Sequence, residues 1–150
     1  MASSLTHLIY HIVFSTKERC PLVTENLSVE LYPYMAGIIR GEGGASLRIG
    51  GVSDHVHILT KLPASKSLSE ILRRIKGNSS KWVNEQPRFC GQFAWQRGYA
   101  AFSVSQSVVE RVAAYIGRQK EHHQAVSFHD ELVSLLEKHG VEYDERYLLG

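Results

Sequence analysis

Apolar residues alternate in some segments, as in strands, and recur at helical spacing in others. These two patterns predict an α+β fold for this chain of 150 residues, with helices packed on an antiparallel sheet. Runs typical of strands and helices follow one another as strand, helix, strand, strand, helix, strand, and further helices come after the fourth strand. This is the order of the split β-α-β, or ferredoxin-like, sandwich. Because the chain shows no repeat or linker and 43% of its residues are hydrophobic, we expect a single domain over residues 1–150. Helices should cover one face of the sheet, which leaves the other face for a site or for the extra helices.

The first strand is expected over Leu5–Ser15. Both alternating sets of residues in this segment are largely apolar, which is typical of a central strand covered on both faces. A helix over Thr24–Ile39 follows, with apolar residues at helical spacing. Pro33 within it predicts either a kink or a later start, because proline removes a backbone donor and crowds the preceding turn. The glycine-rich segment Gly41–Gly44 ends this helix.

Two strands over Ala45–Gly51 and Val56–Leu62 are joined by a turn around Asp54, and we expect them to form a hairpin. Ser67 starts the next helix, and Glu70 follows three residues later in the capping-box arrangement. The apolar stripe of that helix consists of Leu68, Ile71, Leu72, Ile75 and Trp82.

The fourth strand is expected over Tyr99–Ser105, where apolar and polar residues alternate. Ser107 and Glu110 repeat the capping box and predict the start of another helix. A last helix over about Phe128–His139 ends at Gly140. The buried side of the helix after Ser107 is expected to consist of Val108, Val109, Val112 and Ile116.

The net charge of +2 is too small to indicate a nucleic-acid-binding protein, but the charges are segregated. Residues 66–97 are mostly basic among their charged members, and residues from 127 onward are mostly acidic. Such segregation suits a protein with one side facing phosphates, and an ordinary solvated helix face explains the charges equally well. The basic residues of the first segment are Lys66, Arg73, Arg74, Lys76, Lys81, Arg88 and Arg97.

The two cysteines, Cys20 and Cys90, are isolated, so the sequence predicts neither a zinc ribbon nor a disulfide framework. The first residues lack the charged start and apolar core of a signal peptide. No apolar run is long enough to span a membrane. We therefore expect a soluble protein of a reducing compartment, the cytoplasm.

Two short motifs, far apart in the sequence, carry the chemistry. His55 and His57 alternate on a predicted strand, so both side chains point to the same face. Tyr115 and Gln119 are four residues apart in a run that is predicted to be helical, and so share one face of it. Two imidazoles and an amide oxygen can hold a divalent metal, and a tyrosine hydroxyl can act as a nucleophile. Together the motifs predict metal-assisted phosphodiester chemistry with a covalent tyrosine intermediate.

Each of these residues also has a structural explanation. A histidine pair on a strand is often structural, and a helical tyrosine usually packs in or near the core. The joint occurrence of the two motifs around one predicted sheet favours a site. We expect a packing or outer role for His122 and His123, and a hydrogen-bonded core position for His11. Asp54 either orients an imidazole or is an ordinary hairpin residue.

The segment His55-Val56-His57 resembles the metal-binding HUH motif of single-strand DNA nucleases. Tyr115 with Gln119 resembles the single catalytic tyrosine and third metal ligand of the single-tyrosine insertion-sequence transposases. The similarity extends from about Thr6 to Tyr147. Domesticated relatives that act on repetitive extragenic palindromes share the pattern, so the class of DNA element stays open. Other segments that resemble the family are Lys76–Trp82, Trp95–Tyr99, Gln119–His123 and Glu142–Tyr147.

The resemblance implies a reaction, a cofactor and partners. Tyr115 would attack a DNA phosphorus and leave a 5′-phosphotyrosine and a free 3′-hydroxyl, with Mg²⁺ or Mn²⁺ on His55, His57 and Gln119. The DNA would be single-stranded with a hairpin near each cleavage site. A homodimer is implied as well, in which the helix that carries Tyr115 docks either on the partner's sheet or on its own. The protein would then be cytoplasmic and associated with the nucleoid when bound to DNA.

Basic side chains of the second predicted helix and the loop after it are the expected phosphate contacts. The tryptophans and Tyr99 could stack on unpaired bases, although core packing is the better explanation for Trp82. A non-catalytic module that binds single-stranded nucleic acid, and a domesticated enzyme that nicks palindromes, are the alternative functions. The expected phosphate contacts are Arg73, Arg74, Lys76, Lys81 and Arg97.

Overall fold

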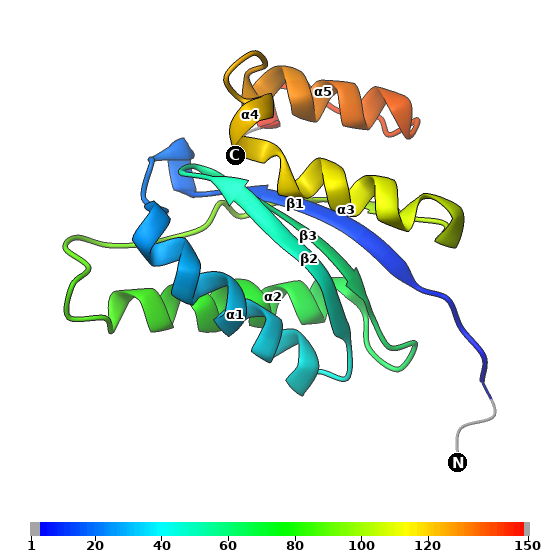
Figure 1. Ribbon diagram of the computed structural model, residues 1–150, viewed down its shortest axis with the longest axis horizontal. Helices are drawn as coiled ribbons and strands as arrows, with labels where there is room; N and C mark the ends of the chain where they lie inside the picture. The colour runs from blue at the N-terminus through cyan, green and yellow to red at the C-terminus, as the bar shows by residue number, and fades with distance from the viewer. Residues whose placement is uncertain (1–3, 149–150) are drawn as a thin grey trace.

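Four antiparallel strands form the sheet of the computed structural model, which describes residues 4–148 (Figure 1). Their order across the sheet is β2-β3-β1-β4, and one helix lies between β1 and β2 and another between β3 and β4 along the chain. This arrangement confirms the predicted ferredoxin-like sandwich. The strands are β1 (Ile9–Ser15), β2 (Ala45–Val52), β3 (His55–Lys61) and β4 (Ala100–Ser103).

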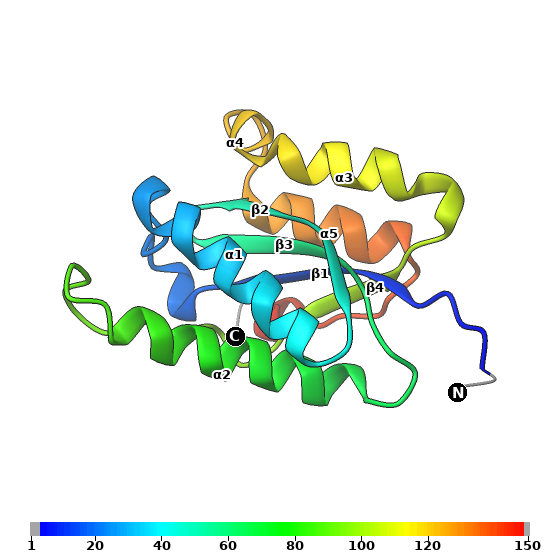
Figure 2. The same ribbon diagram turned by 60° about the horizontal axis from the view of Figure 1, so that its bottom comes forward.

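Helices α1 (Glu25–Gly41) and α2 (Leu68–Asn84) cover one face of the sheet and bury the main core against it (Figure 2). Both begin at a side-chain cap. The Thr24 hydroxyl accepts from the N–H of Leu27, and the Ser67 hydroxyl accepts from the N–H of Glu70, as the predicted capping position requires. α1 runs without interruption through Pro33, so the expectation of a later helix start was wrong.

The opposite face carries α3 (Val109–Gly117), α4 (Gln119–His122) and α5 (Phe128–Lys138). Figures 1 and 2 both show these helices on the side of the sheet away from α1 and α2. α3 lies on β2 and β3, whereas α5 packs on β1 and β4 through a smaller apolar cluster. The extra helices therefore cover the second face and enclose whatever side chains point from it.

The central strand β1 is buried on both faces, as its composition predicted. Ile12 and Phe14 point into the core beneath α1 and α2. Ile9 and Val13 point toward α3 and α5, and His11 lies between them on the same face. Because side chains alternate along a strand, the same parity places His55 and His57 of β3 on the α3 and α5 side.

Gly50 allows α3 to approach the sheet closely. A Cβ atom at this position would lie 2.7 Å from the backbone oxygen of Ile116, a distance that side-chain carbons do not tolerate. The absence of a side chain at Gly50 therefore determines how closely α3 approaches the sheet. Tyr115, one residue before Ile116, is held next to the sheet as a result.

Two local predictions on this side of the sheet were wrong. The capping box at Ser107 and Glu110 is not formed, because the chain enters α3 through a 3₁₀ turn over Gln106–Val108, and the Ser107 hydroxyl lies 2.9 Å from that of Ser105. The helix that was expected to carry both Tyr115 and Gln119 is also divided. α3 ends at Gly117 and α4 starts at Gln119, on either side of Arg118 with φ −106° and ψ 23°.

β4 is shorter than the predicted strand at both ends, but its parity is as expected, with Phe102 and Val104 on the α3 and α5 side. α5 starts at the predicted residue, where the Ser127 hydroxyl accepts from the N–H of Asp130. Within residues 4–148, no helix has the length and apolar character needed to cross a membrane.

Candidate active site

His55 and His57 form the part of the site that the sheet supplies. Both side chains have no exposed surface and point from β3 toward α3 and α5. The Nδ1 atom of His55 lies 2.8 Å from the Asp54 carboxylate, and the Nδ1 atom of His57 lies 2.8 Å from Nε2 of His11. These contacts leave the Nε2 atom of each imidazole facing the same interior point. Asp54 therefore orients His55, and His11 is the hydrogen-bonded core histidine that the sequence predicted.

Glu131 of α5 faces the two Nε2 atoms and was not identified from the sequence. Its Oε1 atom lies 3.0 Å from His57 Nε2 and 3.4 Å from His55 Nε2, and the residue is only 3% exposed. An available signal was its position within an apolar helical stripe, where a charged residue needs a buried partner. The stripe consists of Phe128, Glu131, Leu132, Leu135 and Leu136.

Gln119 and His123 approach the same point from the segment around α4. The Oε1 atom of Gln119 lies 3.2 Å from His55 Nε2, and its amide nitrogen donates to Glu131 Oε2 at 3.0 Å. His123 Nε2 lies 3.0 Å from Glu131 Oε1 and 2.9 Å from Gln119 Oε1. The sequence suggested a packing or outer role for His123, whereas the structure directs its Nε2 into the cluster.

Tyr115 of α3 completes the arrangement. Its hydroxyl donates to the Glu131 carboxylate, and its ring lies 5.8 Å from the ring of His57 between centroids. His122 lies beside it, with 5.3 Å between the two ring centroids. The four residues singled out from the sequence, His55, His57, Tyr115 and Gln119, are thus brought together within one chain.

The cluster contains a donor set suited to a divalent cation. Ligand atoms of four residues lie within 4.8 Å of one another, and they comprise three imidazoles and one carboxylate. Imidazole and carboxylate ligands together suit first-row divalent metals, and the buried position of the carboxylate calls for a positive partner. The four residues are His55, His57, His123 and Glu131.

The environment shifts the pKa values of the cluster in opposite directions. Burial alone would raise the pKa of Glu131, but hydrogen bonds from His55 and His57 outweigh it and hold the value well below its ordinary range. Burial, followed by the hydrogen bond to Glu131, raises the pKa of Tyr115. Burial and, after it, the charge of His57 lower the pKa of His11 to about 3. At neutral pH, Glu131 is therefore ionised and His11 is neutral.

Four of the five basic residues expected to contact DNA lie on α2, on the face of the sheet away from this cluster, and Arg97 lies in the loop before β4. Arg74 donates to Glu42 at 2.9 Å and to Glu70 at 3.1 Å. Lys76 donates to the carbonyl oxygen of Gly98 at 2.6 Å, and burial lowers its pKa to about 8. The remaining three, Arg73, Lys81 and Arg97, are exposed.

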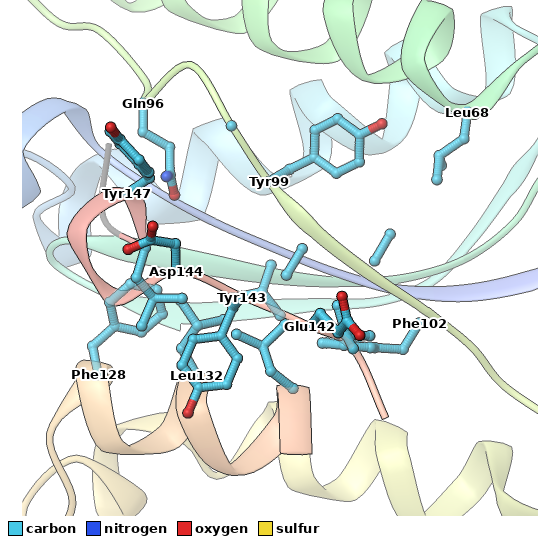
Figure 3. Close-up of a pocket in the computed structure, with 17 residues that line it drawn as sticks. Leu68, Gln96, Tyr99, Phe102, Phe128, Leu132, Glu142, Tyr143, Asp144 and Tyr147 are labelled. Carbon is cyan, nitrogen blue, oxygen red and sulfur yellow. The ribbon is translucent and has the colours of Figure 1, made fainter. Parts of the chain in front are cut away.

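The aromatic residues expected to stack on bases differ in exposure. Trp82 packs on Tyr34 with 4.7 Å between ring centroids, in agreement with the preferred packing role. Trp95 is buried and donates from Nε1 to the Ser79 hydroxyl, so it is not available for stacking. Tyr99 is 40% exposed and lines a cavity of about 500 Å³ between β4, α5 and the C-terminal segment that includes Tyr147 (Figure 3).

Comparison with protein families identifies a match over most of the chain. The model of the family described as "Transposase IS200 like" matches residues 4–119. The matched segment contains both strand histidines and Tyr115 and ends at Gln119. No curated protein matches the chain.

Two solved structures share the fold. One, from Deinococcus radiodurans R1 and described as a transposase, is 21% identical, has a TM-score of 0.60, and is matched over 79% of this chain and 95% of that one. The other is a REP-associated tyrosine transposase bound to a REP hairpin. It is 14% identical, has a TM-score of 0.61, and is matched over 84% of this chain and 76% of that one.

Proposed function

The chain belongs to the family of IS200-like transposases, and from this premise we propose that it cuts and rejoins single-stranded DNA through a covalent bond between Tyr115 and a 5′-phosphate. The observation that supports the proposal most directly is that the four side chains singled out from the sequence all contact the Glu131 carboxylate. These groups are the Tyr115 hydroxyl, the Gln119 amide and the imidazoles of His55 and His57. A tyrosine beside a ligand set of this kind is what metal-assisted phosphoryl transfer needs.

The proposed cofactor is Mg²⁺ or Mn²⁺, held by His55 and His57 with the Gln119 oxygen. His123 and Glu131 are further candidate ligands, since their donor atoms face the same point. Several imidazoles favour Mn²⁺ over a cation that binds oxygen ligands only. When bound, the cation supplies a positive charge that polarises the scissile phosphate and favours the ionised form of a nearby phenol.

The two oxygens of Glu131 suggest separate roles for one side chain. Oε1 faces His57 and His123, whereas Oε2 accepts from Gln119 and lies on the tyrosine side. We assign Oε1 to the cation and Oε2 to the phenol. The low pKa of Glu131 makes it a weak base, so its part is to orient the hydroxyl, and the proton of the phenol passes to water.

In the proposed reaction the phenolic oxygen of Tyr115 bonds to the scissile phosphorus, and the bond from phosphorus to the 3′-oxygen breaks. The 3′-oxygen takes up a proton from water and leaves as a hydroxyl. The ester energy stays in the phosphotyrosine bond, so the reverse attack by a 3′-hydroxyl restores DNA without a nucleotide cofactor. Rejoining to a different 3′-end is the strand-transfer step of transposition.

A hairpin next to the cleavage site is proposed as the feature that directs binding. The REP-associated transposase with the same fold was solved with a REP hairpin. Arg73 and Lys81 are exposed on α2, and Arg97 is exposed in the loop before β4, so these three remain proposed phosphate contacts. Arg74 and Lys76 already have partners within the chain and would have to exchange them for phosphates.

We propose a homodimer in which each site is built within one chain. Two DNA ends must be held to move a segment, and a symmetric pair supplies two tyrosines. α3 packs on β2 and β3 of the same chain, which supports sites built within each chain rather than sites shared across the dimer. Action on DNA also makes the cytoplasm, with association to the nucleoid, the proposed location.

A domesticated enzyme that nicks palindromes is the alternative with an observation behind it, namely the likeness in fold to the REP-associated protein. The same cluster would serve both functions, and the DNA that flanks the gene distinguishes them. A purely binding module is less suited, because neither aromatic side chain of β1 is fully exposed: Phe14 is buried, and Tyr10 packs half-buried against the same core.

The test is the formation of a covalent adduct. The protein is incubated with a library of single strands that carry varied hairpins and random flanks, with Mn²⁺ or with EDTA, and is then separated under denaturing conditions. A protein–DNA band that survives detergent and requires the metal is expected. If no strand of the library yields such a band, the proposed reaction is wrong.

A further inference from the structure

A groove of about 580 Å³ lies between α3 and α5, and Tyr115 is one of the residues that line it. α3 and α5 form its walls, and β1 and β4 with the following segment form its floor. Both ribbon views show the two helices on the same face of the sheet (Figures 1 and 2). A volume of this size suits a small molecule or one unit of a polymer. The groove adjoins the metal cluster, since Glu131 belongs to both, and it lies on the face of the sheet away from the basic surface of α2.

The middle of the groove is apolar. Val104 forms part of the floor, Val112 comes from α3, and Leu135 comes from α5. These three side chains approach from different elements and leave a space between helical walls. A flat, partly apolar group such as a nucleobase matches such a space, because its faces are buried while its edges stay near water.

Each helical wall of the groove carries one cation, Arg111 on α3 and Lys138 on α5. Arg111 precedes Tyr115 by four residues, which is about 6 Å along the axis of α3. Lys138 follows Glu131 by seven residues, which is about 10 Å along α5. Both side chains are exposed at the rim and line the groove. The spacing suits successive phosphates of an extended strand whose scissile phosphate is at Tyr115.

The inner end of the groove has a donor that is not fully used. His122 Nε2 is buried and makes no hydrogen bond in the part of the chain that the structure describes, although it lies 3.3 Å from Glu131 Oε2. It is next to the Tyr115 ring. Two acids, Asp130 and Glu131, also line the groove, and their formal charges equal those of its two cations.

We propose that the groove between α3 and α5 holds the unpaired nucleotide next to the scissile phosphate of a single-stranded DNA. The base lies between Val112 and Leu135, and the adjoining phosphates contact Arg111 and Lys138. The inference rests on the proposed function, because it takes the scissile phosphate to lie at Tyr115. It adds a binding site for one nucleotide on the single-stranded side of the cleavage point.

The test measures binding without cleavage. Fluorescein-labelled (dT)20 is titrated into Tyr115→Phe protein in EDTA, and the dissociation constant is taken from anisotropy at several salt concentrations. Ser134→Trp fills the groove from an exposed position of α5, and an affinity loss of about tenfold is expected, comparable to the loss of one stacked base. Arg111→Ala and Lys138→Ala should each reduce the slope of log K against log salt by about 1.

Matched controls lie on the other face of the protein. Val29→Trp places the same indole on an exposed position of α1, and Arg40→Ala removes an exposed arginine of the same helix. Both should bind (dT)20 as the parent does. A second readout is ultraviolet crosslinking of (dT)20 that contains 4-thiothymidine, which should label peptides within residues 104–115 or 130–139.

Unchanged affinity in Ser134→Trp, equal losses in the controls, or crosslinks confined to other segments would each overturn the groove assignment. The outcome is separable from that of the adduct experiment. If adducts form but the groove variants bind (dT)20 with normal affinity, the proposed reaction stands and the nucleotide site is rejected. If the groove variants lose affinity but the adduct experiment yields no adduct, the nucleotide site stands and the proposed reaction is rejected.

Discussion

Single side chains account for most of the chemistry available to this protein, and Glu131 connects them. Its carboxylate is in contact with imidazoles from β3, with the Gln119 amide and with the Tyr115 hydroxyl. A buried carboxylate of this kind is stable only with partners that donate to it. The proposed nucleophile and the candidate ligands are thus positioned relative to one another by a residue from α5.

Tyr115→Phe removes the proposed nucleophile and leaves the ring in place. We expect loss of the covalent adduct and nearly unchanged DNA binding, because the ring still packs against His11 and His57. The denaturing-gel assay measures the adduct and anisotropy measures binding. Tyr99→Phe is the control, since Tyr99 lies at another cavity, and it should form adduct normally. A normal yield of adduct from Tyr115→Phe would contradict the assignment.

The donor set predicts which substitutions weaken metal binding. His57→Ala, His123→Ala and Glu131→Gln should each lower Mn²⁺ affinity by about tenfold or more, because each removes a candidate ligand. Calorimetric titration of the purified protein measures the affinity. His129→Ala is the control, because His129 is a partly exposed histidine of α5 whose contacts are Asp130 and Glu145. If the loss with His123→Ala equals that of the control, His123 has only an outer role.

His11 predicts an acid-dependent loss of stability in the metal-free protein. Its folded-state pKa of about 3 lies below its ordinary value of 6.5, so the unfolded chain binds a proton first as the pH falls. Stability is retained above pH 6.5 and is lost progressively toward pH 3. Between pH 6.5 and 4 the loss from this residue is at most about 3 kcal/mol. His11→Gln should flatten the curve of unfolding free energy against pH, and an unchanged curve would contradict the shift.

Among the secondary-structure elements, α3 has the largest influence on the geometry of the site, through its close packing on the sheet. Gly50 on β2 lets the backbone of α3 approach, and the break at Arg118 then turns the chain so that Gln119 and His123 face the cluster. α5 closes the arrangement from the other side through Phe128, whose ring stacks on His55 with 4.1 Å between centroids.

Gly50→Ala tests whether the close approach of α3 to β2 is needed for stability and for the site. The added carbon would lie 2.7 Å from the Ile116 oxygen, so the helix must move and stability should fall by about 1–3 kcal/mol. Adduct formation should fall as well, because Tyr115 moves with α3. Gly37→Ala in α1 is the matched control, since nothing lies within 4 Å of its Cβ position. The control should be neutral or slightly more stable in chemical denaturation. Equal stability of the two variants would show that α3 does not depend on this close approach.

The whole molecule is a sheet enclosed between two layers of helices, with the cluster between the sheet and the second layer. This layering separates two surfaces. The basic residues of α2 lie on one side, and Tyr115 and the groove between α3 and α5 lie on the other. A DNA substrate with both a hairpin and a single strand would have to contact both surfaces around an edge of the sheet.

A mixed dimer tests where each site is built. A subunit with Tyr115→Phe is paired with a subunit with His55→Ala, and the heterodimer is verified by differential tags. With each site within one chain, every site keeps one defect, and no adduct is expected. Adduct formation by the mixed dimer would show that the sites are shared between chains. A monomer in sedimentation would reject the proposed homodimer itself.

The sequence was sufficient for features that depend on local geometry. Alternation along β1 and β3 gave the parity of His11, His55 and His57, because a strand has a side-chain period of two whatever surrounds it. The ordering of strands and helices was sufficient for the ferredoxin-like sheet. The Ser67 cap was predictable for the same local reason, as its partner is three residues away.

Only the tertiary structure decided which distant segments meet. Glu131 and His123 enter the cluster because α5 and the segment after α4 pack over β3, and no pattern within either segment specifies that contact. Trp95 is buried, and the Ser107 cap is not formed, because packing and chain entry override local preference. The local periodicity of the sequence thus determines which side chains share a face of a strand or helix. Long-range packing determines which groups lie opposite that face, and no periodic pattern in the sequence encodes it.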